Sequence, residues 1–243
     1  MRSVALGIAL LLALLCGGCC DDRPAPPAGQ AATVYQLPGS LADVEAWNRA
    51  HAAGDTREIE LADRERSGAE LTGVDLSGLD LRKSSFAGAN LVRADLRETR
   101  LDKANLREAD LREAKLDGAI LDHAQVLGVT LTDASAQAIR MRWVDLHGAE
   151  LRRVDMSEAD LRGTSFVGAV MDQAKLDHCD LRGADLRGVD LSTASMAEVD
   201  LRGAKADDAT RWPAAIDDPL ARGVEVNGVT LKQLALERQV ENR

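Results

Sequence analysis

Large aromatic side chains are almost absent from this sequence. Phe, Trp and Tyr together make up 2% of the 243 residues, whereas 45% of the residues are apolar. A globular core of this size ordinarily uses more aromatic rings, and a disordered acidic segment holds fewer apolar residues. The core must therefore consist of Leu, Ala and Val, which predicts either a helical or a strictly repetitive architecture.

Basic residues do not outnumber acidic residues in this sequence, and it has only four cysteines. The formal net charge is -10, so the chain lacks the basic surface that nucleic-acid binding needs, and we expect no nucleic-acid partner. Of the four cysteines, only Cys179 lies beyond the first 20 residues. This distribution excludes a disulfide framework and predicts that Cys179 is a buried, unreactive thiol.

The N-terminus has the features of an export signal. Arg2 is followed by an apolar run from Val4 to Leu15, interrupted only by Gly7. Such a run is shorter than the roughly 20 residues of a membrane-spanning helix, but it suits the centre of a secretory signal peptide. We therefore expect an exported protein.

The cysteines that follow resemble a bacterial lipobox, in which small residues precede a cysteine that receives a lipid. Cys19 follows Gly17 and Gly18, so the resemblance implies lipidation of Cys19, with Cys20 as the alternative. Lipoboxes usually have Leu three residues before the cysteine, but Cys16 holds that place here. A cleaved signal without lipid and an uncleaved anchor stay open.

The middle of the chain repeats every five residues from Ala69 onward. If the third residue of each pentad is called its centre, the 28 centres from position 71 to 206 comprise 19 Leu, 4 Met, 2 Phe, 2 Ala and 1 Val. The residues on either side of a centre are mostly polar, as in a strand that faces the core with alternate side chains. A period of five would spread Leu around all sides of an α-helix, so a helix is excluded.

Pentads such as Ala184-Asp185-Leu186-Arg187-Gly188 resemble the A(D/N)LxG motif of the pentapeptide-repeat family. The resemblance implies an all-β fold, a right-handed quadrilateral β-helix with four pentads per coil. Residues 59–208 would then hold 7.5 coils, and at about 4.8 Å per coil the solenoid would be about 36 Å long.

The flanks complete the expected domain organisation. Ser40 to Ala52 predicts an amphipathic N-terminal capping helix. At the other end, Trp212 is expected to cover the last coil, and Val229 to Val240 to form a short helix. The predicted segments are a signal peptide (1–18), a flexible tether (19–39), the N-terminal capping helix (40–58), the repeat β-helix (59–208) and a C-terminal cap and tail (209–243).

Charged residues should form columns, because residues 20 positions apart share a face of the coil. Arg142, Arg162, Arg182 and Arg202 predict a basic column, and Asp160, Asp180 and Asp200 an acidic column beside it. The basic column either binds anions or is neutralised by the acidic one on a solvated surface.

We predict no catalytic, metal-binding or cofactor-binding residues, and therefore no enzyme. None of the four histidines shares a column with another, which disfavours a metal site. No Ser-His-Asp set, phosphate-binding loop or paired-carboxylate cleft is apparent, and a convex rod is expected to have no pocket.

Residues 126–143 depart from the repeat pattern. Ala136 occupies a centre, Leu127 is expected outside, and Trp143 stands where Gly or a polar residue is usual. Leu127 and Val167 share a column. Either Leu127, Trp143 and Val167 form a patch for a partner, or residues 132–143 form a loose coil or a helical excursion with Trp143 turned inward.

These features predict a non-enzymatic, membrane-anchored lipoprotein of the bacterial envelope, acting as a scaffold or protein-binding module. It would be tied to the inner or outer membrane by its N-terminal lipid, on the periplasmic side or the cell surface. Its partner would be an envelope protein, and homodimerisation through a rod end stays open. The alternative is a DNA mimic that inhibits or protects a topoisomerase such as gyrase, as some members of the resembled family do.

Overall fold

A computed structural model describes residues 67–230 and residue 233. The chain divides into two units, residues 1–33 and 34–243, and every described residue belongs to the second. The predicted signal, tether, N-terminal capping helix and first pentads lie outside the described residues. So does most of the helix predicted from Val229 to Val240.

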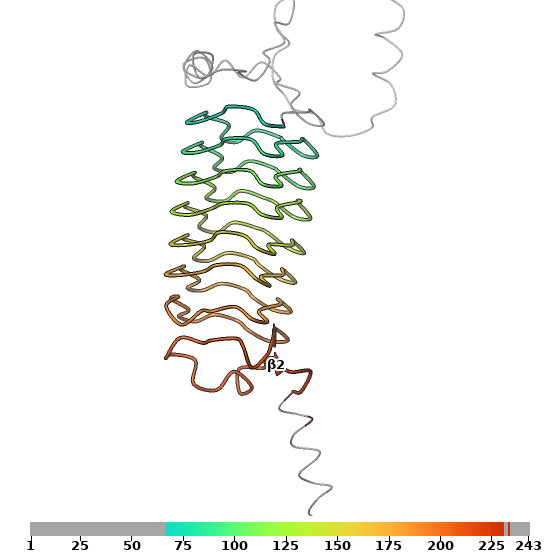
Figure 1. Cartoon of the computed structure of the whole chain (residues 1–243), viewed down its shortest axis with the longest axis vertical. Coiled ribbons are helices and arrows are strands. Elements are labelled where there is room, and N and C mark those ends of the chain that lie inside the picture. Colours follow the sequence, from blue (N-terminus) through green and yellow to red (C-terminus); the bar gives the residue numbers. More distant parts are fainter. Residues whose placement is uncertain (1–66, 231–232, 234–243) are drawn as a thin grey trace, which may run out of the picture. The chain divides into compact units, whose positions relative to one another are not determined.

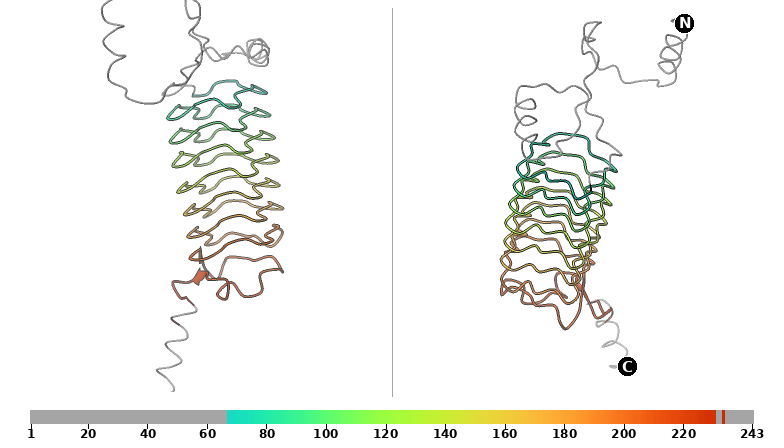
Figure 2. Two further views of the ribbon diagram at one scale, coloured as in Figure 1. Left: turned by 180° about the vertical axis from the view of Figure 1, so that it is seen from behind. Right: turned by 45° about the horizontal axis from the view of Figure 1, so that its top comes forward.

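The described residues form a stack of coils with four pentads in each. The residue before a centre pairs in parallel with the residue 20 positions later, from Glu70 with Asn90 to Asp185 with Lys205, at every such position except Val170. This offset confirms the predicted four-sided β-helix. Figure 1 shows the coils one above another, and Figure 2 shows the same stacking from two other sides.

Backbone hydrogen bonds join each coil to the next. The Leu71 amide donates to the carbonyl of Asn90 at 2.8 Å, the Gly73 amide to Val92 at 2.8 Å, and the Asn90 amide to Ala69 at 2.9 Å. This pattern recurs along the solenoid and satisfies backbone groups that burial would otherwise leave costly.

The core follows the repeat register. Every centre from Leu71 to Ala206 is buried, with no side chain more than 4% exposed. The residue two places before a centre is also turned inward, and the hydroxyls of Thr99 and Thr164 at this position donate to backbone carbonyls. The Thr99 hydroxyl, for example, donates to the Leu96 carbonyl at 2.6 Å. The predicted register is therefore confirmed.

Residues 132–143 form a regular coil. The turn and bridge pattern continues unbroken through them, and the Ala136 centre is fully buried. The alternative of a helical excursion is therefore wrong, because the backbone pairing accepts a small centre without changing its path. In the described residues, no helix has the length and apolar character needed to cross a membrane.

The last residue of a pentad turns the corner with a left-handed backbone. Of the 28 such positions, 26 have positive φ, and 15 of these are not glycine. Trp143 is one of the fifteen, with φ 57°. A left-handed backbone costs a residue with a Cβ roughly 1–2 kcal/mol, so the fold imposes these conformations on residues that would not choose them.

Coil pairing continues beyond residue 208. β1 (Lys205–Ala206) pairs in parallel with β2 (Glu225–Val226), again 20 positions apart. Arg211 pairs with Asp190, an offset of 21 that marks an insertion. Residues 209–226 thus form an irregular last coil, visible at the lower end of the stack in Figure 1. Trp212 packs against the core there, as predicted.

Candidate functional site

Two large apolar side chains break the polar exterior of the described residues. Trp143 is 66% exposed and Leu127 is 40% exposed. Val167 is half-buried and shares a column with Leu127, with His147 between them. Trp143 stands at the corner where their face begins. The alternative in which Trp143 turns inward is therefore wrong, because a corner position points its side chain away from the core.

The Trp143 ring lies against the next coil. A Cβ placed on Gly163 would be 2.3 Å from Cε3 of the indole, so any larger residue at 163 would collide with the ring. Sequence reasoning missed this support, although the 20-residue spacing between positions 143 and 163 would have revealed it. Gly163 thus provides the space in which the indole lies flat and outward.

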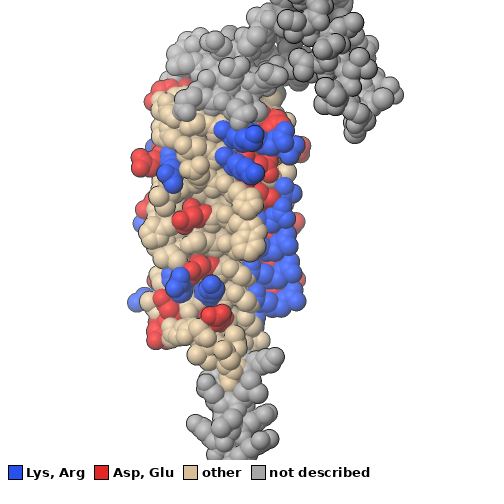
Figure 3. Space-filling model, turned by 90° about the vertical axis from the view of Figure 1, so that its right-hand side faces the viewer, with Lys and Arg blue, Asp and Glu red and all other residues tan. Residues whose placement is uncertain are grey.

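One face of the rod differs from the others in charge. It contains nine basic and six acidic residues, whereas the other three faces between residues 69 and 208 hold ten basic and twenty acidic residues. Figure 3 shows Lys and Arg side chains gathered along one side of the rod, next to a largely uncharged area. We call the face with nine basic residues the arginine face. Its pentads are centred on Leu81, Leu101, Leu121, Met141, Leu161, Leu181 and Leu201.

Arginines of this face clasp aspartates of their own pentads. Nε of Arg162 donates to Oδ1 of Asp160 at 2.8 Å, and Nη2 donates to Oδ2 at 2.7 Å. Arg182 with Asp180 and Arg202 with Asp200 repeat this two-pronged geometry. The predicted neutralisation between the two columns is thus present in the structure.

The pairs are layered, with guanidinium groups outermost. In the three pairs the arginine side chains are 37%, 41% and 70% exposed, and their aspartates 27%, 28% and 31%. The hydrogen bond from Arg202 lowers the pKa of Asp200 to about 2, and the one from Arg182 lowers the pKa of Asp180. The Asp180 and Asp200 carboxylates therefore stay ionised beneath the guanidinium groups.

Arg142 departs from this scheme. Residue 140 is Arg in its pentad, so Arg142 instead reaches Asp122 in the preceding coil, with Nη2 at 2.5 Å from Oδ2. Burial opposes ionisation of Asp122, but hydrogen bonds from Arg142 and the charge of Arg140 leave its pKa lowered overall.

Cys179 is buried, and its thiol donates to the carbonyl of Met156 at 2.9 Å. Burial raises the pKa of this thiol to about 12. A thiol that stays protonated at neutral pH is a poor nucleophile, which fits the predicted unreactive role.

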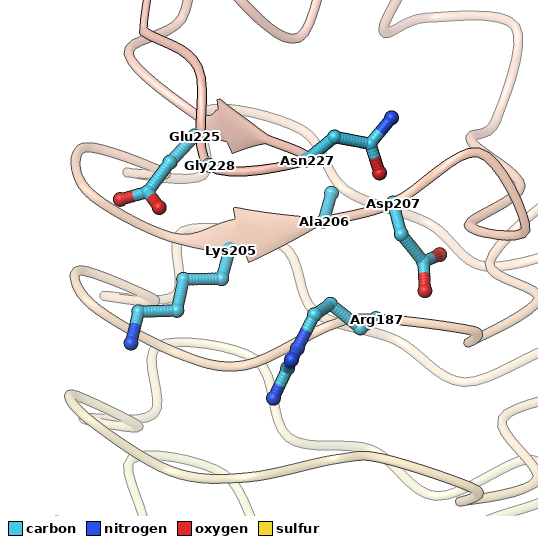
Figure 4. A pocket seen from close by; sticks show the side chains of 7 residues that line it. All are labelled: Arg187, Lys205, Ala206, Asp207, Glu225, Asn227 and Gly228. Carbon is cyan, nitrogen blue, oxygen red and sulfur yellow. The ribbon is translucent and has the colours of Figure 1, made fainter.

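A hollow of about 400 Å³ corrects the expectation that the rod has no pocket. It opens beside the irregular last coil, where β2 and its following turn extend the stack. Figure 4 shows Arg187, Lys205 and Glu225 on successive coils at its edge. Its lining contains no Ser, Thr, Cys or His, and no group of His, Cys, Asp or Glu in the described part of the chain could hold a metal ion.

The chain belongs to the pentapeptide-repeat family. The model described as Pentapeptide repeats matches in eight copies over residues 67–125 and 127–210, more than half of the sequence. Proteins of this family are generally not enzymes. No curated protein matches the chain.

Solved structures of the same family are similar. HetL from the cyanobacterium Nostoc, involved in heterocyst differentiation regulation, is 24% identical, with 75% of this chain and 96% of that chain covered and a TM-score of 0.33. A protein from the Arabidopsis thaliana thylakoid lumen is 28% identical, with 43% and 73% covered and a TM-score of 0.41. QnrB1, a plasmid-mediated fluoroquinolone resistance protein, is 21% identical, with 74% and 84% covered and a TM-score of 0.47.

Proposed function

We propose that this protein is a non-enzymatic binding module of the bacterial envelope, exported and held at a membrane by a lipid on Cys19. It would bind an envelope protein through the patch formed by Leu127, Trp143 and Val167. The observation that carries the proposal is the outward Trp143, which with Leu127 is one of the two exposed large apolar side chains in the described part of the chain.

The position of Trp143 is costly for the rod alone. The residue adopts φ 57° with its side chain 66% exposed, so it bears the cost of a left-handed backbone while burying little apolar area. Exposed tryptophans dominate the binding energy of protein interfaces. A contact with another protein would bury the indole and offset that cost.

The proposed lipid anchor and the proposed non-enzymatic role are supported by different observations. The apolar run from Val4 to Leu15 and the Gly17-Gly18-Cys19 sequence support export and lipidation. The hollow beside β2 is lined by no Ser, Thr, Cys or His, and the buried Cys179 thiol is protonated, which supports a role without catalysis.

The charge pattern does not favour a DNA mimic. A mimic must present carboxylates spaced like a phosphate backbone, but aspartates such as Asp95, Asp110 and Asp185 are clasped by arginines. Such pairing leaves no continuous acidic strip on the faces that carry them.

The binding proposal is tested by replacing Trp143 with Ala and capturing partners from solubilised envelope. Because the indole packs mainly on Gly163, we expect the free energy of unfolding to change by no more than about 1 kcal/mol, while the partner is lost. His123→Ala is the matched control, since His123 occupies the same corner column one coil earlier. A Trp143→Ala variant that still captures the partner would refute the patch.

A further inference from the structure

Positive charge lies beside the patch of Leu127, Trp143 and Val167 (the Trp143 patch), on the side nearer the N-terminus. The arginine-face pentads between residues 79 and 143 hold six basic and three acidic residues, whereas those after residue 143 hold three of each. The basic excess of this face therefore lies in the part that ends at Trp143. Figure 3 shows basic side chains next to a largely uncharged area of the surface.

Two cations in this region, Lys103 and Arg107, are exposed and unpaired. Lys103 stands two coils before Trp143 in the same corner column, and Arg107 stands one coil before Leu127 in the same column. Neither side chain forms an ion pair or hydrogen bond in the described part of the chain, although Glu108 follows Arg107 directly. Because coils rise by about 4.8 Å, Lys103 begins about 10 Å from Trp143 along the rod, and Arg107 about 5 Å from Leu127.

The charges closest to the indole add to this excess. Nε of Arg140 lies 2.9 Å, and Nη2 of Arg142 lies 2.5 Å, from the same oxygen of Asp122. One carboxylate therefore faces two guanidinium groups, and Arg142 directly precedes Trp143. Between residues 99 and 143 the arginine face holds four basic and two acidic residues. The surface that leads from Lys103 to the indole thus has a net positive charge.

The packing of the indole favours a protein segment over a membrane as the ligand of this surface. The ring lies against Gly163 in the next coil, so it does not project from the rod as a side chain that inserts into a bilayer would. The other three faces together have ten more acidic than basic residues, and an extended anionic membrane would approach these as well. A narrow segment along the corner would avoid them.

We propose that the partner presents a segment in which acidic residues adjoin apolar ones, with its apolar side chains on Trp143 and Leu127 and its carboxylates at Lys103 and Arg107. The inference rests on the proposed protein-binding role and specifies the chemistry of the partner. In an extended segment, about three residues span the roughly 10 Å between the two contacts. The apolar contact would provide most of the affinity, and the charges would set the direction in which the segment lies.

The test measures binding of a labelled peptide to the full chain by fluorescence anisotropy. The peptide has a Leu-Leu pair three residues from a Glu-Glu pair, and its counterpart has Gln in place of Glu. We expect added salt to weaken binding of the Glu peptide, and the Gln peptide to bind about fivefold more weakly, as the loss of two exposed ion pairs implies. The double variant Lys103→Gln, Arg107→Gln should weaken the Glu peptide by a similar factor and leave the Gln peptide unaffected.

The matched control is the double variant Lys115→Gln, Lys205→Gln. Both lysines are exposed and also lack an ion pair in the described part of the chain, so this variant removes the same charge from other places on the rod. The Kd of the Glu peptide should change by no more than about twofold, because salt screens distant charges. Circular dichroism melts would verify that both double variants are folded.

Several results would overturn the inference. Equal weakening by the two double variants, or equal affinity for the Glu and Gln peptides, would show that Lys103 and Arg107 do not select the ligand. Binding of phosphatidylglycerol vesicles that requires the two cations, without binding of the Glu peptide, would assign them to a membrane. A dimer in analytical ultracentrifugation that is lost in Trp143→Ala would assign the patch to a second copy of the chain.

Capture from solubilised envelope separates this inference from the proposed function. If Trp143→Ala loses the partner and the Lys103→Gln, Arg107→Gln variant retains it fully at low salt, the patch binds a protein but the acidic complement is wrong. If both variants retain the partner, the proposed function itself is wrong.

Discussion

Leu111 illustrates what a single centre contributes to the rod. It is 1% exposed, and its column continues with Leu91 and Leu131 one coil away on either side. Removing this side chain would therefore leave a cavity between coils that hydrogen bonds hold at a fixed spacing.

We expect Leu111→Ala to lower the free energy of unfolding by about 2–5 kcal/mol, because it loses buried apolar surface and leaves a void. Urea denaturation followed by circular dichroism would measure the change. Arg112→Ala is the adjacent control: its side chain is exposed, so it should shift stability by only about 0.5 kcal/mol. Equal losses for the two variants would show that the register is wrong.

Substitutions at Gly163 and Gly183 distinguish the cost of a strained backbone from the loss of the space in which Trp143 packs. Their φ values are 68° and 69°, so Ala at either position bears a similar left-handed cost of about 1 kcal/mol. Only at residue 163 would the new Cβ collide with the indole. We expect Gly163→Ala to be the more destabilising change in thermal unfolding, and the difference to vanish in a Trp143→Ala background. Identical melting of the two single variants would contradict the packing of Trp143 on Gly163.

At the scale of the pentad and its columns, the sequence predicts the features that every pentad shares. It does not predict the few positions that depart from the repeat. The apolar centres and the 20-residue pairing follow from the period of five, because only a stacked coil buries every centre. The direction of Trp143 could not be read in this way, since a corner position accepts any side chain that tolerates positive φ. The pairing of Arg211 with Asp190 was hidden by an insertion that breaks the period.

Layered Arg–Asp pairs also give the rod a definite response to acid. Arg202 and Arg182 lower the pKa of Asp200 to about 2 and that of Asp180 below its ordinary value of 3.8. A carboxylate with a lowered pKa in the folded state stabilises the fold fully above its unfolded pKa. That stability is lost as the pH falls through the folded pKa.

We therefore expect the melting temperature to fall between about pH 4 and pH 2. Circular dichroism melts across this interval would measure it. Relief of the general repulsion in a chain of net charge -10 would instead raise the melting temperature, so the sign of the change distinguishes the two effects. A constant or rising melting temperature would mean that the pairs contribute little.

For the whole molecule, the ends of the stack matter most, because a bare coil edge offers unpaired backbone groups to other chains. At the C-terminal end the irregular coil of residues 209–226 covers the edge, with Ile216 and Val224 buried and Trp212 packed on the core. Because this coil covers the end of the stack, the regular coils are exposed there only on their side faces. The side of the rod that carries the Trp143 patch is thus the surface that we propose for a partner.

The proposed membrane anchor belongs to the N-terminus and not to the rod. Cys19 should carry the lipid, because it follows Gly17-Gly18 directly. Acyl chains contribute about 0.8 kcal/mol per buried CH₂ group to membrane binding. Cys19→Ser should therefore abolish incorporation of labelled fatty acid and leave the protein soluble or unprocessed, whereas Cys20→Ser should keep the label and the membrane fraction. Loss of label in Cys20→Ser alone would move the lipid to the alternative cysteine. Unchanged labelling and fractionation in both variants would refute the lipoprotein assignment, while the rod and its binding faces would stand as they are.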